Sequence, residues 1–192
     1  MKLFLLFFSF FIIQNSIAQI TTNVSWTEKT DMPASDVIYY KANKKLQWDH
    51  FLGAIPANPG IVAALTVSGF GYGASLKTIN GKGELNITVY CYFSKNRSWV
   101  KPGKNTAYIL NHEQHHFDVS YIAAELFIDK LQSAKFTNGN YNELLARIYK
   151  ECCDSMNKMQ NEYDGQTNNG QVKAEQSRWD ALIDSRISAI LR

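Results

Sequence analysis

The chain has few cysteines and few histidines, which limits the metal sites that it can build. Its 192 residues include three cysteines, and no two of them have the Cys-x-x-Cys spacing of a cysteine-based zinc site. Histidine occurs four times. A zinc site in this chain is therefore expected to use histidine rather than cysteine.

The chain also lacks a concentrated charge and, beyond its first residues, a long apolar run. Its formal net charge of +3 is small and is not clustered, and aromatic residues do not alternate with basic ones along any stripe. Nucleic-acid binding therefore has no support. Internal repeats and low-complexity segments are absent, and no later segment is long or apolar enough to span a bilayer.

The first 18 residues have the pattern of a secretory signal peptide. A short basic start is followed by an apolar run from Leu3 to Ile13, and Ser16-x-Ala18 supplies small residues before the expected cleavage. The next residue is Gln19 rather than cysteine, so a lipoprotein anchor is not expected. We predict an exported protein, periplasmic or secreted, with residues 19–192 forming a single domain. The alternative is an N-terminal anchor that is not cleaved.

An oxidising compartment would allow the cysteines to pair. Cys91 lies on the inward face of a predicted strand, and Cys152 and Cys153 are adjacent on a predicted helix. A bond between the adjacent pair would strain a helix. We therefore predict a disulfide from Cys91 to Cys152 or Cys153, with one thiol left over.

The order of patterns predicts an α+β domain in which an N-terminal antiparallel sheet is followed by helices. Strand patterns cover residues 36–41 and 61–72, and residues 75–79 and 84–93 form a hairpin around Asn80-Gly81-Lys82-Gly83. Helical spacing then predicts a first helix from residue 105 or 106 to 132 and a second over 141–163. A third helix is expected over 172–191.

The first predicted helix contains the pattern His-Glu-x-x-His at His112, Glu113 and His116. Side chains four residues apart on a helix differ by about 40° in direction, so both imidazoles can bind one ion. Glu113 points about 100° away from His112, where a carboxylate reaches a metal-bound water but is poorly placed as a ligand. Zn²⁺ suits two imidazoles and acidifies its water, so Glu113 would act as general base.

Angular positions on this helix predict its surroundings. Two stripes of largely apolar residues imply covering elements on two sides, one of which carries the histidine pair. His115 points about 60° away from His112 and is expected to be outside the ligand set or exposed. Asn111, Gln114, Asp118 and Glu125 fall in the remaining sector, together with Asp129 and Gln132, which predicts that this sector faces solvent.

A catalytic zinc ion normally has a third protein ligand. His50 is far upstream in the sequence. The acidic residues of the first helix point away from the two histidines. The third ligand is therefore expected from the element that covers the histidines. The end of the second helix offers Glu162, Asp164 and Asn169.

Several motifs together resemble an uncharacterised bacterial family described as predicted secreted zinc-dependent proteases. They are Leu46-x-Trp48-x-x-Phe51-x-Gly53, Phe93-x-x-x-x-Ser98-Trp99-Val100, Leu110-Asn111-His112-Glu113-Gln114-x-His116-Phe117-Asp118, Tyr163-Asp164-x-x-Thr167-x-x-Gly170 and Gln176-x-x-Trp179. They cover nearly all of the chain after residue 18. The resemblance implies a zincin-like fold and a zinc-dependent activity.

One position departs from that family. Its members tend to carry Thr-x-His-Gly where this chain has Thr167-Asn168-Asn169-Gly170. If that histidine is the family's third ligand, Asn169 replaces it poorly, because a neutral amide binds zinc less well than imidazole. Asp164 would then complete the site, or the site would be weakened.

The sequence thus predicts an exported zinc metallohydrolase, specifically a peptidase acting on a peptide or protein substrate. His112 and His116 bind the metal, Asp164 or Asn169 completes the ligand set, and Glu113 is the general base. Tyr163 is the candidate for stabilising the oxyanion. The alternative is a catalytically weakened or inactive binding domain that keeps the fold.

Overall fold

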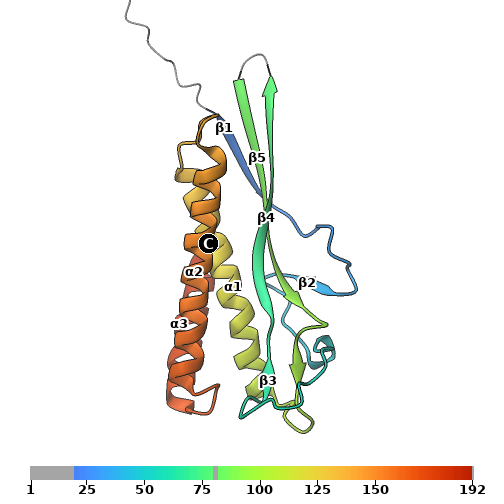
Figure 1. The fold of residues 1–192 in the computed structure, drawn as a ribbon. Coiled ribbons are helices and arrows are strands. Elements are labelled where there is room, and N and C mark those ends of the chain that lie inside the picture. The colour runs from blue at the N-terminus through green and yellow to red at the C-terminus, as the bar shows by residue number, and fades with distance from the viewer. Residues whose placement is uncertain (1–19, 80–81, 192) are drawn as a thin grey trace, which may run out of the picture.

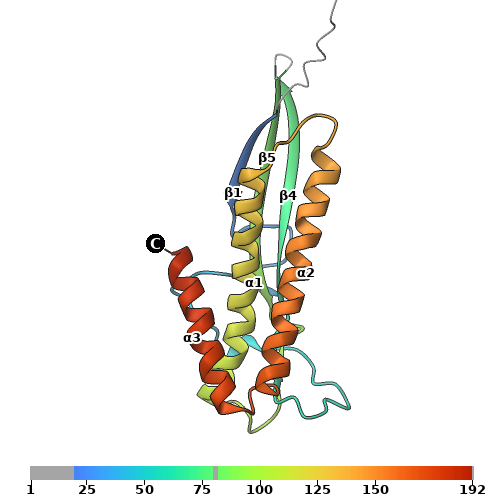
Figure 2. The ribbon, with the colours of Figure 1, turned by 90° about the vertical axis from the view of Figure 1, so that its left-hand side faces the viewer.

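The protein consists of a layer of helices packed on one face of a β-sheet (Figure 1). The structure is a computed structural model that describes residues 20–79 and 82–191. Viewed from the helix side, the first helix lies between the other two and against the sheet (Figure 2). The predicted signal peptide and its cleavage site lie outside the described residues.

The sheet is mixed rather than antiparallel. β4 (Ser68–Ile79) and β5 (Lys82–Ser94) form a long antiparallel hairpin, and β2 (Val37–Tyr39) pairs antiparallel with the end of β5. β1 (Thr21–Trp26) pairs with β5 in parallel, from Thr21 opposite Glu84 to Trp26 opposite Val89. The sequence prediction missed β1 and was therefore wrong about the antiparallel sheet. A short segment with alternating exposure signals a strand only weakly, and its direction depends on its partner.

The predicted alternation of the second hairpin strand is confirmed. The side chains of Leu85, Ile87, Val89, Cys91 and Phe93 on β5 are buried, and the intervening residues are more exposed. One face of an antiparallel pair commonly packs on the core in this way. The predicted strands 61–72 and 75–79 are replaced by two strands with different bounds. These are β4 and the short β3 (Ala64–Leu65), which pairs antiparallel with β6 (Trp99–Val100).

The three predicted helices are confirmed with small changes at their ends. α1 spans Ala107–Ser133, α2 spans Tyr141–Thr167 and α3 spans Lys173–Ile190. Thr106 is the N-cap of α1, and its side chain accepts a hydrogen bond from the Ile109 amide. α2 continues four residues beyond its predicted end and stops at Asn168, which has left-handed backbone angles.

The sector of α1 that was predicted to face solvent is partly buried. Gln114 and Asp118 are 5% and 0% exposed. The segment that follows β2 covers them: the Tyr40 hydroxyl donates to Asp118 Oδ1 at 2.8 Å, and the Leu46 amide donates to Gln114 Oε1 at 2.7 Å. Gln114 also donates to Asp118 Oδ1 at 2.8 Å. A central helix covered on three sides can bury polar residues because these hydrogen bonds satisfy them.

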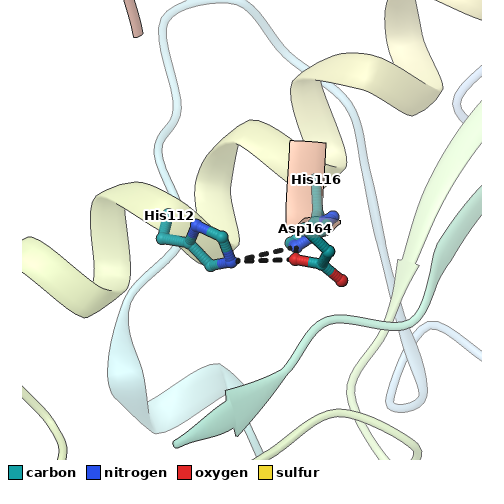
Figure 3. Close-up of side chains that lie close together, drawn as sticks. All are labelled: His112, His116 and Asp164. Atoms are coloured by element: carbon teal, nitrogen blue, oxygen red, sulfur yellow. Dashed lines mark hydrogen bonds and ion pairs between the residues drawn. The ribbon is translucent and has the colours of Figure 1, made fainter. Parts of the chain in front are cut away.

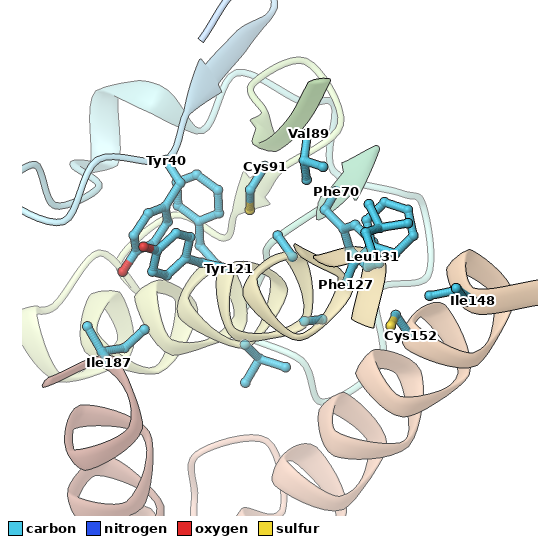
Figure 4. Close-up of a cluster of buried hydrophobic side chains, with 14 of the residues drawn as sticks. Tyr40, Phe70, Val89, Cys91, Tyr121, Phe127, Leu131, Ile148, Cys152 and Ile187 are labelled. Carbon is cyan, nitrogen blue, oxygen red and sulfur yellow. The ribbon is translucent and has the colours of Figure 1, made fainter. Parts of the chain in front are cut away.

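The apolar core lies between the sheet and α1 and continues between α1 and α2 (Figure 4). Cys91 points from β5 toward the aromatic residues Tyr40 and Tyr121, whereas Cys152 packs on α2 near Ile148. Cys91, Cys152 and Cys153 are all free. The predicted disulfide is therefore wrong in this structure: both of the buried thiols belong to the core, but Cys91 enters it from β5 and Cys152 from α2.

In the described part of the chain, no helix combines the length and the apolar character that crossing a bilayer requires.

Candidate metal centre

Three side chains that the sequence singled out meet at one point. His112 Nε2 and His116 Nε2 lie 3.2 Å apart, and Asp164 Oδ1 lies 3.2 Å from the first and 3.0 Å from the second. Figure 3 shows both imidazoles on α1 turned toward the carboxylate from α2. Two ligands that bind one tetrahedral ion at about 2.0–2.2 Å lie about 3.3–3.6 Å from each other. The three atoms are slightly closer together than this, so small side-chain shifts would give them the separations of a ligand set for a single metal ion.

The local sequence explains how α1 and α2 position these three side chains. His112 and His116 share one face of α1 because they are four residues apart. Asp164 lies in the last turn of α2, which packs beside α1. The buried Thr167 then holds the end of α2 in place: its hydroxyl donates to the Tyr163 carbonyl at 2.7 Å and accepts from the Gly170 amide at 3.1 Å.

The other nitrogen of each imidazole contacts a glutamine. His112 Nδ1 lies 2.8 Å from Gln176 Oε1 of α3, and His116 Nδ1 contacts Gln160 Oε1 of α2. The ring of Tyr163 stacks on His112 with centroids 4.6 Å apart and an interplanar angle of 27°. Each histidine is therefore held by a polar contact as well as by its own helix.

Glu113 lies beside the ligand atoms but outside their set. Its side chain is 3% exposed, and its Oε2 has no hydrogen-bond partner among the described residues. The Thr66 hydroxyl donates to the Glu113 backbone carbonyl at 3.1 Å, which ties this turn of α1 to the segment between β3 and β4. Burial raises the pKa of Glu113, and the neighbouring His116 and His112 oppose this shift. Such a buried carboxylate oxygen is typical of a group that accepts and releases a proton in the cleft.

The charges of the cluster are strongly coupled. Burial raises the pKa of Asp164, but hydrogen bonds with His112 and His116 outweigh it and hold the pKa well below its usual range. For His116, burial lowers the pKa, while the hydrogen bond with Asp164 and the charge of Glu113 raise it to about 9. The cluster thus attracts positive charge, and a proton on His116 and a metal cation compete for the same position.

The cluster lies in a cleft of about 310 Å³. One wall is the extended segment 62–68, which includes β3, and the other consists of residues from α1, α2 and the turn after α2. Ser68 holds the first wall to α1, because its hydroxyl lies 2.8 Å from the Ser120 hydroxyl and donates to the His116 carbonyl at 3.3 Å. His112, Glu113, His116, Asp164 and Asn169 all line this cleft.

Asn169 is the one predicted ligand that the structure does not bring into the cluster. It lines the cleft with left-handed backbone angles (φ 54°), and no hydrogen bond joins its side chain to either imidazole. Of the alternatives at the end of α2, Glu162 is exposed and faces Lys158 at 3.8 Å instead. Asp164 is therefore the third ligand that the geometry supports.

The predicted role of Tyr163 in stabilising an oxyanion does not agree with its position. The side chain is fully buried behind His112 and does not line the cleft. Its hydroxyl donates to the His112 carbonyl at 3.3 Å and accepts from Gln176 Nε2 at 2.6 Å. Both contacts are within the protein, so Tyr163 supports His112 instead of facing a substrate.

His115 and His50 are both outside the metal cluster. His115 is 2% exposed, so it is buried rather than exposed, with Nδ1 3.2 Å from Asp180 and Nε2 3.5 Å from Asp184, both on α3. His50 ends a short 3₁₀ helix (Trp48–His50), where its Nδ1 accepts from the Gln47 amide at 3.0 Å. These contacts leave His112 and His116 as the two histidines of the candidate metal site.

Sequence reasoning missed Gln160 and the contact of Gln176 with His112. Glutamine is not a metal ligand of choice, so neither residue stands out by type. The available signal was spacing: Gln160 precedes Asp164 by four residues, which places both on the face of α2 that covers the histidines.

Comparison with protein-family models finds no match for this chain, and comparisons with curated proteins and with solved structures find no significant similarity.

Proposed function

We propose that this protein is an exported zinc-dependent hydrolase with a zincin-like site that cleaves peptide bonds. The observation that carries this proposal is the convergence of His112, His116 and Asp164 in the cleft onto which Glu113 also opens. The proposal of export depends on residues 1–18, outside the described part of the chain.

The ligand chemistry fits zinc. Two imidazoles and one carboxylate are a common protein ligand set for catalytic zinc, which leaves a position for water or substrate. The same set binds ferrous iron in oxygenases. The buried carboxylate of Glu113 next to the ligands favours hydrolysis, because hydrolysis needs a proton acceptor there and the activation of oxygen does not.

In the proposed reaction, zinc held by these three residues would supply Lewis acidity, which acidifies water and polarises a carbonyl group. Glu113 would accept the proton of the attacking water at Oε2 and pass it to the leaving amine. Asp164 would contribute the negative charge of the ligand set. Tyr163 would keep the His112 ring in place by stacking on it.

The lining of the cleft favours a peptide substrate. Val62, Leu65, Ile109 and Met156 contribute apolar side chains to its walls. Among the described residues, no lysine or arginine lines the cleft, so it lacks the cation that recognition of a phosphate group normally requires. An uncharged segment of a peptide or protein matches such walls, whereas a nucleic acid does not.

One observation favours the alternative of a weakened or inactive binding domain. Asn169 lies in the cleft at the position where the resembled family tends to carry histidine, and it makes no hydrogen bond with the cluster. The metal would then have only two protein ligands unless the Asp164 carboxylate binds it as the third.

Metal content tests the ligand set directly. The chain starting at Gln19 should contain one zinc ion per molecule by elemental analysis, and Asp164→Asn should lower the zinc affinity strongly. Glu162→Gln is the matched control, because Glu162 also carries a carboxylate in the last two turns of α2 but points away from the cleft. Its zinc affinity should equal that of wild type. Wild-type protein that binds no zinc even with zinc added, or that binds only iron, would overturn the proposal.

A further inference from the structure

We propose that Gln160 and Gln176 are positioning residues that keep the hydrogen on Nδ1 of both imidazoles, so that Nε2 of each ring is the nitrogen that binds the ion. This inference rests on the proposed zinc site. The two glutamines would make the histidines ready to bind before the metal arrives.

The contacts of Gln176 determine which end of its amide faces His112. Its Nε2 donates to Asp180 Oδ1 at 2.7 Å and to Tyr163 Oη at 2.6 Å, and its Oε1 lies 2.8 Å from His112 Nδ1. A carboxylate can only accept hydrogen bonds, so the NH₂ end must face Asp180 and the oxygen must face His112. An amide oxygen also only accepts, and His112 Nδ1 therefore carries the hydrogen.

Gln160 is oriented in the same way by a different acceptor. Its Nε2 donates to the backbone carbonyl of His116 at 2.8 Å, and its Oε1 contacts Nδ1 of that same histidine. Because a backbone carbonyl cannot donate, the amide cannot be turned round. His116 Nδ1 must therefore donate to Gln160, and one side chain holds both the ring and the backbone of this residue.

Both assignments have the same consequence for the metal. A hydrogen on Nδ1 leaves Nε2 as the basic nitrogen of each ring, and the two Nε2 atoms face Asp164 Oδ1 at 3.2 and 3.0 Å. The Gln176 side chain is 1% exposed, so water cannot easily replace it as the acceptor. Since Gln160 is on α2 and Gln176 on α3, the packing of two different helices against α1 prepares the ligands.

Removal of each acceptor tests the inference. Gln160→Met and Gln176→Met keep approximately the same side-chain size but cannot accept from Nδ1. Each should lower the zinc affinity by about 10- to 100-fold, as is typical when the partner of a metal-bound histidine is lost. The measurement is competition with a zinc chelator of known affinity. Gln166→Met is the matched control, because Gln166 is also on α2 but accepts from Trp179 Nε1 and lies away from the histidines. Its zinc affinity should not change.

Two further readouts separate positioning from a general effect on folding. Nitrogen NMR of the zinc-loaded protein should show the hydrogen on Nδ1 of both rings in wild type, and the signal of the affected ring should change in each Met variant. Gln160→Glu keeps an acceptor oxygen and should recover most of the affinity that Gln160→Met loses.

Zinc affinities of Gln160→Met and Gln176→Met equal to wild type would overturn the inference. If either variant unfolds, the other and the Gln160→Glu variant decide. Failure of the wild-type protein itself to bind zinc is a separate result, seen before any variant is compared, and it would overturn the proposed function.

Discussion

Glu113 differs from the histidines beside it in the contacts of one buried oxygen. His112 and His116 each contact a glutamine and Asp164, whereas Glu113 Oε2 makes no hydrogen bond with any residue that the structure describes. These neighbouring residues of one helix turn thus have different roles because their contacts differ. In the proposed site, two of these residues would bind the metal, and the third would exchange a proton.

The substitution Glu113→Gln separates metal binding from catalysis. Zinc content should stay at the wild-type level, because Glu113 is outside the ligand set. The rate of peptide hydrolysis should fall by about 10²- to 10⁴-fold, because an amide cannot accept the proton of the attacking water. Zinc analysis and hydrolysis of a broad peptide library measure both quantities. If wild type binds zinc but cleaves nothing and the variant behaves identically, the binding-domain alternative replaces the peptidase.

At the scale of elements, the turn between α2 and α3 sets the geometry of the site. Asn168 and Asn169 both have positive φ, followed by Gly170 with φ +77°. Three successive left-handed residues reverse the chain within a few residues of Asp164, so that α3 starts close enough to bring Gln176 to His112. A Cβ atom on Gly170 would lie 3.3 Å from the imidazole of His112.

Gly170→Ala should therefore lower both stability and zinc affinity. The stability loss is expected to be about 1 kcal/mol or more, because a residue with a Cβ atom is strained at positive φ. The zinc affinity should fall because the new methyl group presses on the His112 ring. Thermal unfolding and chelator competition measure the two effects.

Gly103→Ala is the control for this substitution. Gly103 has a similar φ of +72°, but a Cβ atom there would have no neighbour within 4 Å. It should lose comparable stability and keep the wild-type zinc affinity. Equal zinc affinities in both variants would show that the contact between Gly170 and His112 has no effect on the site.

At the scale of the whole molecule, the candidate metal centre joins parts that are far apart in the sequence. α1 supplies two of the candidate ligands and α2 the third, while α3 and the segment between β3 and β4 hold α1 from two further sides. Binding of an ion would therefore link α1 to α2 in addition to their apolar contact. A ligand that binds only the folded state stabilises that state.

Removal of zinc should accordingly lower the melting temperature. Zinc at about 100 times its dissociation constant adds about 2.7 kcal/mol to the free energy of unfolding. For a domain of this size that corresponds to a shift of about 5–10 °C, which a chelator should reverse. The measurement is thermal unfolding with zinc and with chelator. His116→Ala lacks one ligand and should show no such shift, and a shift of wild-type size in that variant would locate the bound zinc elsewhere.

The local features of this protein could be predicted from its sequence. The three helices, the inward face of β5 and the shared direction of His112 and His116 all follow from spacing along the chain. The features that the sequence did not predict involve contacts between segments that are far apart in the chain. β1 pairs with β5 in parallel, and Gln114 and Asp118 are buried under the segment after β2. Whether a helix face is buried in this way depends on which distant segment of the chain packs against it. The spacing of residues on the face itself does not reveal that segment.

The residues of the candidate metal site can likewise be divided into those that the sequence predicts and those that only the structure reveals. Local sequence is enough to place His112 and His116 on one helix face with Glu113 beside them, because the geometry of an α-helix depends only on neighbours in the chain. It left Asp164 and Asn169 both open as the third ligand. The packing of the helices brings Asp164 to the two histidines, buries Tyr163 away from the cleft and places Gln160 and Gln176 against the imidazoles. These outcomes depend on how α2 and α3 pack against α1, and that packing is decided by contacts between residues far apart in the sequence.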